Sequence, residues 1–252
     1  MKMTMISEGF PGKMLQGYMG WSSSVLVQKE GKNILFDTSG IDMRVDLVPR
    51  VEKAGVKPED VHYLAISHFH LDHIYNYDYF PNAEIVMHED EIAYARKGED
   101  PWQPHHMLEP VEKSGRLRSV REGESLIPGV SVIHLPGHTP GCMGLVLEDP
   151  ALPLTVIAGD AIKTLAEMAT GRAAMTSAPE QTFASVRKVR SFAKQVVPGH
   201  DRVLRIEEDR VVAAVAARRT IVVPPDVIDR GAPRYLELTL EQSWLPFAEG
   251  LR

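Results

Sequence analysis

The sequence predicts an α/β fold, and three observations lead to this class. Short apolar runs alternate along the chain with segments whose apolar residues recur at helical spacing. Four of the apolar runs lead directly into a histidine or aspartate cluster. The chain has 252 residues, of which 44% are hydrophobic, so it is long enough to bury a sizeable core. Because ligands at strand exits are typical of α/β sites, we expect the chemistry at one edge of a sheet.

The first half of the chain begins with a predicted hairpin. Two β-type runs, 23–30 and 33–38, flank the turn pair Gly31-Lys32. Helical spacing over 45–55 stops at Gly55, which predicts a helix, and the apolar run 61–66 predicts a short buried strand. The pattern continues with a strand over 83–88, a helix over 89–97 and a polar, proline-rich segment over 98–115 to which no element is assigned.

The second half repeats the alternation. Strands are predicted over 130–138, 142–148, 154–160 and 195–201, the first and the last two running into polar loops, and a helix over 179–194. We expect residues 1–220 to form one catalytic domain. Residues 221–252, rich in proline at their start, are expected to be an extension that packs on this domain or on a second subunit, which allows a homodimer or a higher homo-oligomer.

Composition narrows the function. The net charge is −6 and basic residues occur only in pairs or short groups, so a nucleic-acid partner is not expected. Cys142 is the only cysteine, which excludes an internal disulfide and a thiolate-rich metal site. No apolar stretch approaches about 18 residues and no secretory leader is visible, so we expect no membrane span and a cytoplasmic location.

Residues 67–73, SHFHLDH, concentrate metal-binding groups immediately after a predicted strand. Three further ligand candidates follow in LPGHTPG, AGD and PGHD. The set comprises His68, His70, Asp72, His73, His138, Asp160 and His200. Imidazole suits zinc, iron, manganese or cobalt, and a carboxylate can bridge two cations. In an extended or turn conformation, positions 68 and 70 point the same way while 72 and 73 turn to a second pocket, so one motif can serve two ions.

From about residue 20 to 205 the chain resembles the metallo-β-lactamase fold superfamily, whose signature is H-x-H-x-D-H followed by distant His, Asp and His. The resemblance implies an αββα sandwich of two packed mixed sheets with helices on the outer faces. It implies one ion on His68, His70 and His138 and a second on Asp72, His73 and His200, with Asp160 bridging them. It also implies that Asp37, in LFDT, is not itself a metal ligand but orients one as its hydrogen-bond partner.

The resemblance implies a dinuclear hydrolase in which a metal-bridging hydroxide attacks a lactone or ester, with two divalent ions, zinc first and Fe, Mn or Co as alternatives. Asp72 and Asp160 would take part as ligands. The phrases SHFHLDH, LPGHTPG and PGHD resemble those of N-acyl homoserine lactone lactonases. The alternatives are a glyoxalase II-like thioesterase, a hydrolase of another activated electrophile, and a mononuclear-iron persulfide dioxygenase.

Two departures from the lactonases concern the substrate. Lys163 stands where they carry a tyrosine, and either stabilises an oxyanion or binds a substrate carboxylate, or is a solvated surface lysine. Ile74 and Tyr75 follow the last histidine of the motif, where most relatives have a pair of glycines. The loop 9–21 is predicted as a mobile hydrophobic lid, or else packs on the first sheet. The substrate pocket is assigned to Phe10, Tyr18, Met19, Trp21 and Tyr75, and a small molecule with an apolar or aromatic portion is expected.

Overall fold

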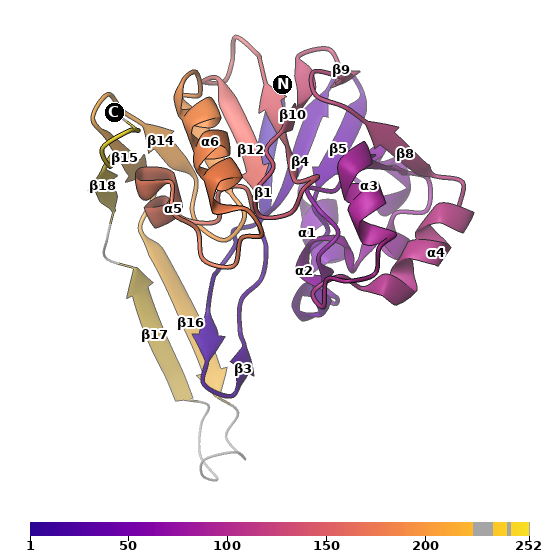
Figure 1. Ribbon diagram of the computed structural model, residues 1–252. Coiled ribbons are helices and arrows are strands. Elements are labelled where there is room, and N and C mark those ends of the chain that lie inside the picture. Colours follow the sequence, from indigo (N-terminus) through magenta and orange to yellow (C-terminus); the bar gives the residue numbers. More distant parts are fainter. Residues whose placement is uncertain (224–233, 241–242, 252) are drawn as a thin grey trace.

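The computed structural model describes the whole chain except residues 224–233, 241–242 and 252. Two β-sheets pack face to face, and helices cover their outer faces (Figure 1). This is the expected αββα sandwich, so the predicted fold class is confirmed. No helix in the described ranges is long and apolar enough to cross a membrane.

The first sheet has six strands in the order β1-β4-β5-β6-β7-β8. Their bounds are β1 Lys2–Ser7, β4 Ser24–Lys29, β5 Lys32–Phe36, β6 Tyr63–Ala65, β7 Glu84–His88 and β8 Leu117–Val120. Strands β1, β4 and β5 are antiparallel, whereas β5 to β8 run parallel. The helices of this half are α1 Leu47–Lys53, α2 Leu71–Ile74, α3 Glu89–Ala95 and α4 His105–Lys113, with short 3-10 turns at Ile41–Met43, Pro58–Asp60 and Tyr77–Tyr79.

The second sheet has eight strands in the order β18-β15-β14-β13-β12-β11-β10-β9. Their bounds are β9 Ser125–Ile127, β10 Val130–His134, β11 Met143–Leu147, β12 Thr155–Gly159, β13 Gln195–Pro198, β14 Leu204–Ile206, β15 Arg210–Ala213 and β18 Trp244–Pro246. All neighbours are antiparallel except β12 and β13. Helices α5 Leu165–Thr170 and α6 Pro179–Arg190 belong to this half.

Three apolar clusters hold the layers together. The central one joins the facing sides of the two sheets, with Val25 and Val27 of β4 packed in the same cluster as Leu145 of β11 and Ile157 of β12. An outer cluster places α1, α3 and α4 on the first sheet, and the other places α5 and α6 on the second. Burial of these alternating faces is the main force that assembles the sandwich.

Helix α4 is one of several elements that the sequence did not predict, together with α5 and strands such as β8, β14 and β15. It lies inside the proline-rich segment 98–115, with Pro110 in its interior. A proline there removes one backbone donor, which is why propensity alone argues against a helix. Val111 is fully buried in the cluster beneath the first sheet, and Met107 and Leu108 pack against it, so tertiary burial outweighs the local preference.

Two hairpins extend from the same end of the sandwich (Figure 1). One is β2 Lys13–Met14 with β3 Gly17–Tyr18, and the other is β16 Ala217–Val223 with β17 Arg234–Leu240. The boundary expected at residue 220 falls inside β16, and β18 returns to pair with β15 in the second sheet. Within the extension, positions 224–233, 241–242 and 252 lie outside the described residues.

Candidate metal centre

The candidate ligands converge from both sheets. SHFHLDH follows β6 of the first sheet, whereas His138, Asp160 and His200 follow β10, β12 and β13 of the second. Backbone hydrogen bonds join the two halves at this point, because Met143 N–H donates to the Ser67 carbonyl and Ser23 N–H to the Gly199 carbonyl. The strand exits therefore meet where the sequence placed its histidines and aspartates.

Glycines beside the ligands allow this close approach. A Cβ on Gly199 would lie 2.1 Å from Asp160 Oδ1, and one on Gly137 would lie 2.3 Å from Thr182 Oγ1. Gly137 also has a φ of +141°, which disfavours residues with a side chain. The glycines in PGHD and LPGH are therefore required by packing.

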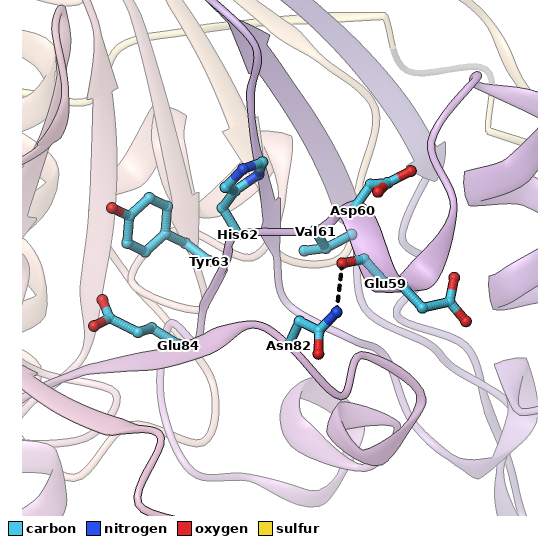
Figure 2. A pocket seen from close by; sticks show the side chains of 7 residues that line it. All are labelled: Glu59, Asp60, Val61, His62, Tyr63, Asn82 and Glu84. Atoms are coloured by element: carbon cyan, nitrogen blue, oxygen red, sulfur yellow. Dashed lines mark hydrogen bonds between the residues drawn. The ribbon is translucent and has the colours of Figure 1, made fainter.

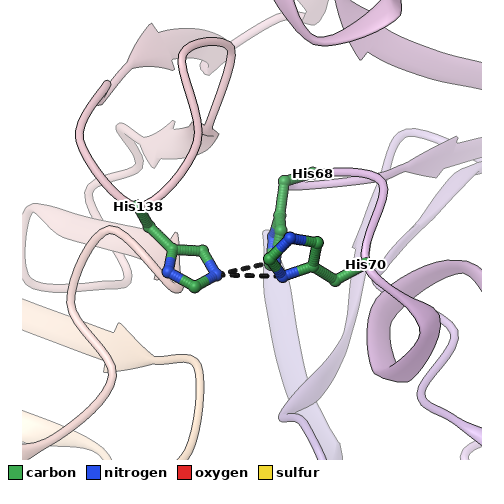
Figure 3. Close-up of side chains that lie close together, drawn as sticks. All are labelled: His68, His70 and His138. Atoms are coloured by element: carbon green, nitrogen blue, oxygen red, sulfur yellow. Dashed lines mark hydrogen bonds between the residues drawn. The ribbon is translucent and has the colours of Figure 1, made fainter. Parts of the chain in front are cut away.

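The first group of ligand atoms comprises three imidazole nitrogens. His138 Nε2 lies 3.1 Å from His68 Nε2 and 3.1 Å from His70 Nδ1. Figure 3 shows His138 facing the other two rings from the opposite side of the site. A tetrahedral zinc ion, about 2.0–2.1 Å from each nitrogen, separates its ligand nitrogens by roughly 3.3–3.4 Å. The observed spacing is close to that value.

The second group comprises Asp72, His73 and His200. Asp72 Oδ2 lies 3.3 Å from His200 Nε2 and 3.6 Å from His73 Nε2. Asp160 lies between the two groups: its Oδ1 is 3.4 Å from His73 Nε2 and 3.2 Å from His200 Nε2, and its Oδ2 is 3.4 Å from His138 Nε2. One carboxylate thus presents an oxygen to each group.

A second observation, the lack of hydrogen-bond partners at two buried ligand atoms, also indicates that these residues are suited to metal ions. His73 Nε2 and Asp160 Oδ1 are buried, yet neither has a hydrogen-bond partner among the residues that the structure describes. Unsatisfied buried polar atoms are costly unless something binds them. The clusters are therefore suited to holding metal ions.

Each of the five imidazoles is anchored through the nitrogen that does not face its group. His70 Nε2–H donates to Asp100 Oδ2 at 2.9 Å, and His73 Nδ1–H to Asp37 Oδ2 at 2.8 Å. The remaining anchors are Ser67 Oγ for His68 (2.9 Å), the Met175 carbonyl for His138 (2.8 Å) and the Trp21 carbonyl for His200 (2.9 Å). Such partners fix the tautomer and the ring orientation of metal-binding histidines.

Of these anchors, the sequence identified Asp37 alone. A backbone carbonyl leaves no signature in a sequence, so Met175 and Trp21 could not be found. Asp100 lies in the proline-rich segment, where its carboxylate also accepts hydrogen bonds from Tyr94 Oη and Trp102 N–H.

Burial and the neighbouring carboxylates have opposite effects on the pKa values of the histidines at the centre. Burial lowers the pKa of His138 to about 3, and burial among other imidazoles lowers the pKa of His68 well below its ordinary value. Burial also opposes charge on His200 and His73, but Asp160 and Asp72 outweigh it and raise the pKa of both, that of His200 to about 10. The rings of His68 and His138 are thus held neutral, as metal ligands must be.

Lys163 does not point freely into the centre. Its Nζ donates to the Ala174 carbonyl at 2.7 Å and lies 3.5 Å from Glu167 Oε1. The side chain is 13% exposed, so it is neither a solvated surface lysine nor a free cation.

The residues assigned to the substrate pocket separate into two sets. Met19 and Trp21 line a cavity of about 440 Å³ with Glu8, Asp42, Met43, Asp46, Arg50 and Arg219. The cavity lies beside the second group, because Trp21 also supplies the carbonyl that anchors His200. Phe10 is buried against Trp21 with ring centres 5.3 Å apart, and Tyr18 contacts Trp102 instead. Tyr75 is half-buried after α2 and does not line the cavity.

The loop 9–21, predicted as a mobile lid or as packed on the first sheet, differs between its base and its tip. Its base is packed, since Phe10 and Trp21 pair through their backbones and Phe10 is only 7% exposed. Its tip forms the β2–β3 hairpin, where Leu15 is fully exposed and Met14 and Tyr18 are about half exposed.

Two other features lie apart from the centre. A hollow of about 310 Å³ is found at the starts of β6 and β7, the opposite end of these strands from SHFHLDH (Figure 2). His62 lines this hollow, but its Nδ1 already accepts a hydrogen bond from the Asn33 N–H. His88 and His134 stack at 3.9 Å near Asp90, yet His88 Nδ1 accepts the Asp90 N–H and His134 Nε2 donates to the Pro140 carbonyl.

Comparison with known proteins agrees with this geometry. The family model of the metallo-beta-lactamase superfamily matches residues 20–204. Metallo-beta-lactamase domain-containing protein 1 of Xenopus laevis is 26% identical over 201 residues, which cover 77% of this chain and 80% of that protein. An N-acyl homoserine lactonase of Bacillus thuringiensis is 24% identical over 159 residues, 62% of either chain, so the match spans less than two thirds of the lactonase.

Solved structures share the fold at low identity. A metallo-beta-lactamase candidate from Thermotoga maritima has a TM-score of 0.65 and 21% identity, covering 81% of this chain and 98% of its own. An N-acyl homoserine lactone hydrolase, solved with N-hexanoyl-L-homoserine at its catalytic metal centre, has a TM-score of 0.60 and 20% identity, covering 73% and 82%.

Proposed function

The chain belongs to the metallo-beta-lactamase superfamily of metal-dependent hydrolases, and from that premise we propose that it hydrolyses lactones or esters at a centre of two divalent ions. The observation that carries the proposal is the position of Asp160, which turns one oxygen to His138 and the other to His73 and His200. A carboxylate between two cations reduces their mutual repulsion, as a dinuclear centre requires.

Divalent ions bound there supply Lewis acidity and a nucleophile at neutral pH. We assign zinc first, with Fe, Mn or Co as alternatives, because imidazole and carboxylate accept all four. His68, His70 and His138 would hold one ion, and Asp72, His73 and His200 the other.

The protein residues have separate tasks in this proposal. Burial opposes charge on Asp72, but His73 and His200 outweigh it and hold the pKa of this carboxyl well below its ordinary value, so Asp72 stays ionised, as a metal ligand must be. Met19, Trp21 and Met43 give the neighbouring cavity an apolar wall. We propose that the apolar or aromatic portion of the substrate lies against this wall.

Lactones are favoured because the lactonases named above share sequence with this chain, but thioesters remain a second candidate for the same chemistry. The complete group of Asp72, His73 and His200 speaks against the mononuclear-iron dioxygenase, which would leave these three ligands without an ion.

Proton release from a panel of lactones, aryl esters, thioesters and a β-lactam tests the proposal, with a pH indicator as the readout. We expect acidification with lactones or esters that stops when a chelator is added and returns with zinc. Rapid turnover of thioesters alone would reassign the substrate class, and no turnover by protein that holds two ions would refute the proposal.

A further inference from the structure

Lys163 connects the loop that carries His200 with the segment whose backbone anchors His138. Its carbonyl accepts the His200 N–H at 2.9 Å, and its Nζ donates to the carbonyl of Ala174, the residue before the one that anchors His138. We infer that Lys163 is a positioning residue, which holds the segment 174–175 against His138 and thereby fixes a metal ligand without touching the substrate. The inference rests on the proposed metal centre and extends it to a residue outside the ligand set.

The lysine is itself held rigidly. Glu167 lies one helical turn further on, in α5, and its Oε2 accepts the Lys163 backbone N–H at 2.6 Å while Oε1 lies 3.5 Å from Nζ. Glu167 is 6% exposed, and both ends of the Lys163 residue are therefore tied to one buried carboxylate. A lysine held in this way loses little further freedom when it supports the carbonyl of Ala174.

Met175 shows why support is needed. Its φ is +56°, a left-handed conformation that is uncommon for a residue other than glycine. Such a conformation persists only where the surroundings impose it. Here the Met175 carbonyl accepts His138 Nδ1–H, and its Sδ lies 3.3 Å from both Lys13 Nζ and Tyr18 Oη of the β2–β3 hairpin.

The segment is thus held from two sides, by Lys163 within the domain and by the hairpin outside it. Loss of the Lys163 contact frees the Ala174 carbonyl and lets Met175 relax from its left-handed conformation. The Met175 carbonyl then turns away from His138, whose ring loses the anchor that directs Nε2 toward His68 and His70. We therefore expect Lys163 to affect metal affinity, which a substrate-binding lysine would not do.

The test compares Lys163→Met, which removes the donor, with Lys163→Arg, which keeps a donor that reaches a carbonyl. Lys97→Met, an exposed lysine in the turn after α3, is the control. Zinc affinity is measured by competition with a chromophoric chelator, and the visible spectrum of the cobalt-loaded protein reports the geometry around His138. Neither measurement requires a substrate.

For Lys163→Met we expect zinc affinity at one site to fall about 10-fold, the lower end for the loss of an orienting partner, and the cobalt spectrum to change. Lys163→Arg should restore both, and Lys97→Met should match the wild type. Unchanged affinity and spectrum in Lys163→Met, with or without a raised KM, would overturn the inference. Thermal melting of the apo proteins separates a weaker site from a failure to fold, and Lys163→Gln, whose shorter side chain does not reach the Ala174 carbonyl, tests the inference with the same expected loss if Lys163→Met does not fold.

This outcome is independent of the reaction. Protein that binds two ions but hydrolyses nothing in the panel would refute the proposed function and leave the affinity measurement valid. Active protein in which Lys163→Met leaves the zinc affinity and the cobalt spectrum unchanged would support the proposed function and refute the inference about Lys163.

Discussion

Asp37→Asn is the most informative single change, because it keeps the shape of the site and reverses one hydrogen bond. Asp37 is fully buried; its Oδ1 accepts the Ser67 N–H at 2.7 Å, and its Oδ2 accepts the Ser67 hydroxyl and His73 Nδ1–H, each at 2.8 Å. Its φ of +55° is one that asparagine tolerates, so the backbone is expected to stay in place.

The asparagine oxygen can still accept the Ser67 N–H, but its NH₂ group then faces His73 Nδ1. Two donors cannot bond, so His73 must move its proton to Nε2, the atom that faces Asp72 and Asp160. A protonated Nε2 cannot bind a metal ion. Loss of an orienting partner commonly lowers metal affinity by about 10- to 100-fold, or roughly 1.4–2.8 kcal/mol, and we expect the upper part of that range at one site.

The assay is zinc titration of apo protein in competition with a chelator, which resolves the affinity of each site. We expect the larger loss of affinity at the site of Asp72, His73 and His200, and a smaller loss in the first group, because the Ser67 hydroxyl binds both Asp37 and His68. Asp209→Asn, in an exposed turn, is the control for the lost charge. Two sites of wild-type affinity in Asp37→Asn would refute the claim that the Asp37 carboxylate sets the tautomer of His73.

Three further predictions concern the bridge, the cavity and a buried carboxyl. Asp160→Ala removes an oxygen from each group, so bound metal after dialysis should fall from two ions per chain to one or fewer; retention of two ions would remove the bridging assignment. Asp42→Asn removes a negative charge from the lining of the cavity, so kcat/KM for carboxylate-bearing esters should improve about fivefold relative to neutral esters. An unchanged ratio would mean that these esters do not bind in this cavity. Burial raises the pKa of Glu167 from 4.5 to about 7, so the folded state binds this proton more tightly than the unfolded state. The wild type should therefore lose up to about 3 kcal/mol of stability relative to Glu167→Gln between pH 4.5 and pH 7, and parallel urea-unfolding curves across that range would contradict this.

Sequence reasoning was strongest where chemistry and periodicity agree. The ligands follow apolar strands, and the fold brings the ends of those strands together at one edge. The seven nominated side chains therefore converge in space, although their positions run from His68 to His200. The parallel alignment of β5 and β6 likewise places Asp37, which follows β5, beside Ser67, which follows β6.

Sequence reasoning could not reach features that are set by tertiary contacts. Lys163 has the charge expected of an oxyanion or carboxylate partner, but Ala174 and Glu167 engage it, and neither contact is visible in the sequence around it. Tyr18 and Met19 are neighbours in the chain, yet Tyr18 contacts Trp102 and Met175 while Met19 lines the cavity.

The position of the centre makes metal binding and folding interdependent. The first sheet supplies His68, His70, Asp72 and His73, and the second supplies the other three ligands, so bound ions would connect the two halves of the sandwich. Without ions, the edge holds buried imidazoles and carboxylates that satisfy one another only in part. An ion that binds only the folded protein stabilises it by mass action. The loops at this edge are then ordered by two factors, the bound ions and the anchors behind each imidazole, and the anchors keep the rings aligned while the site is empty.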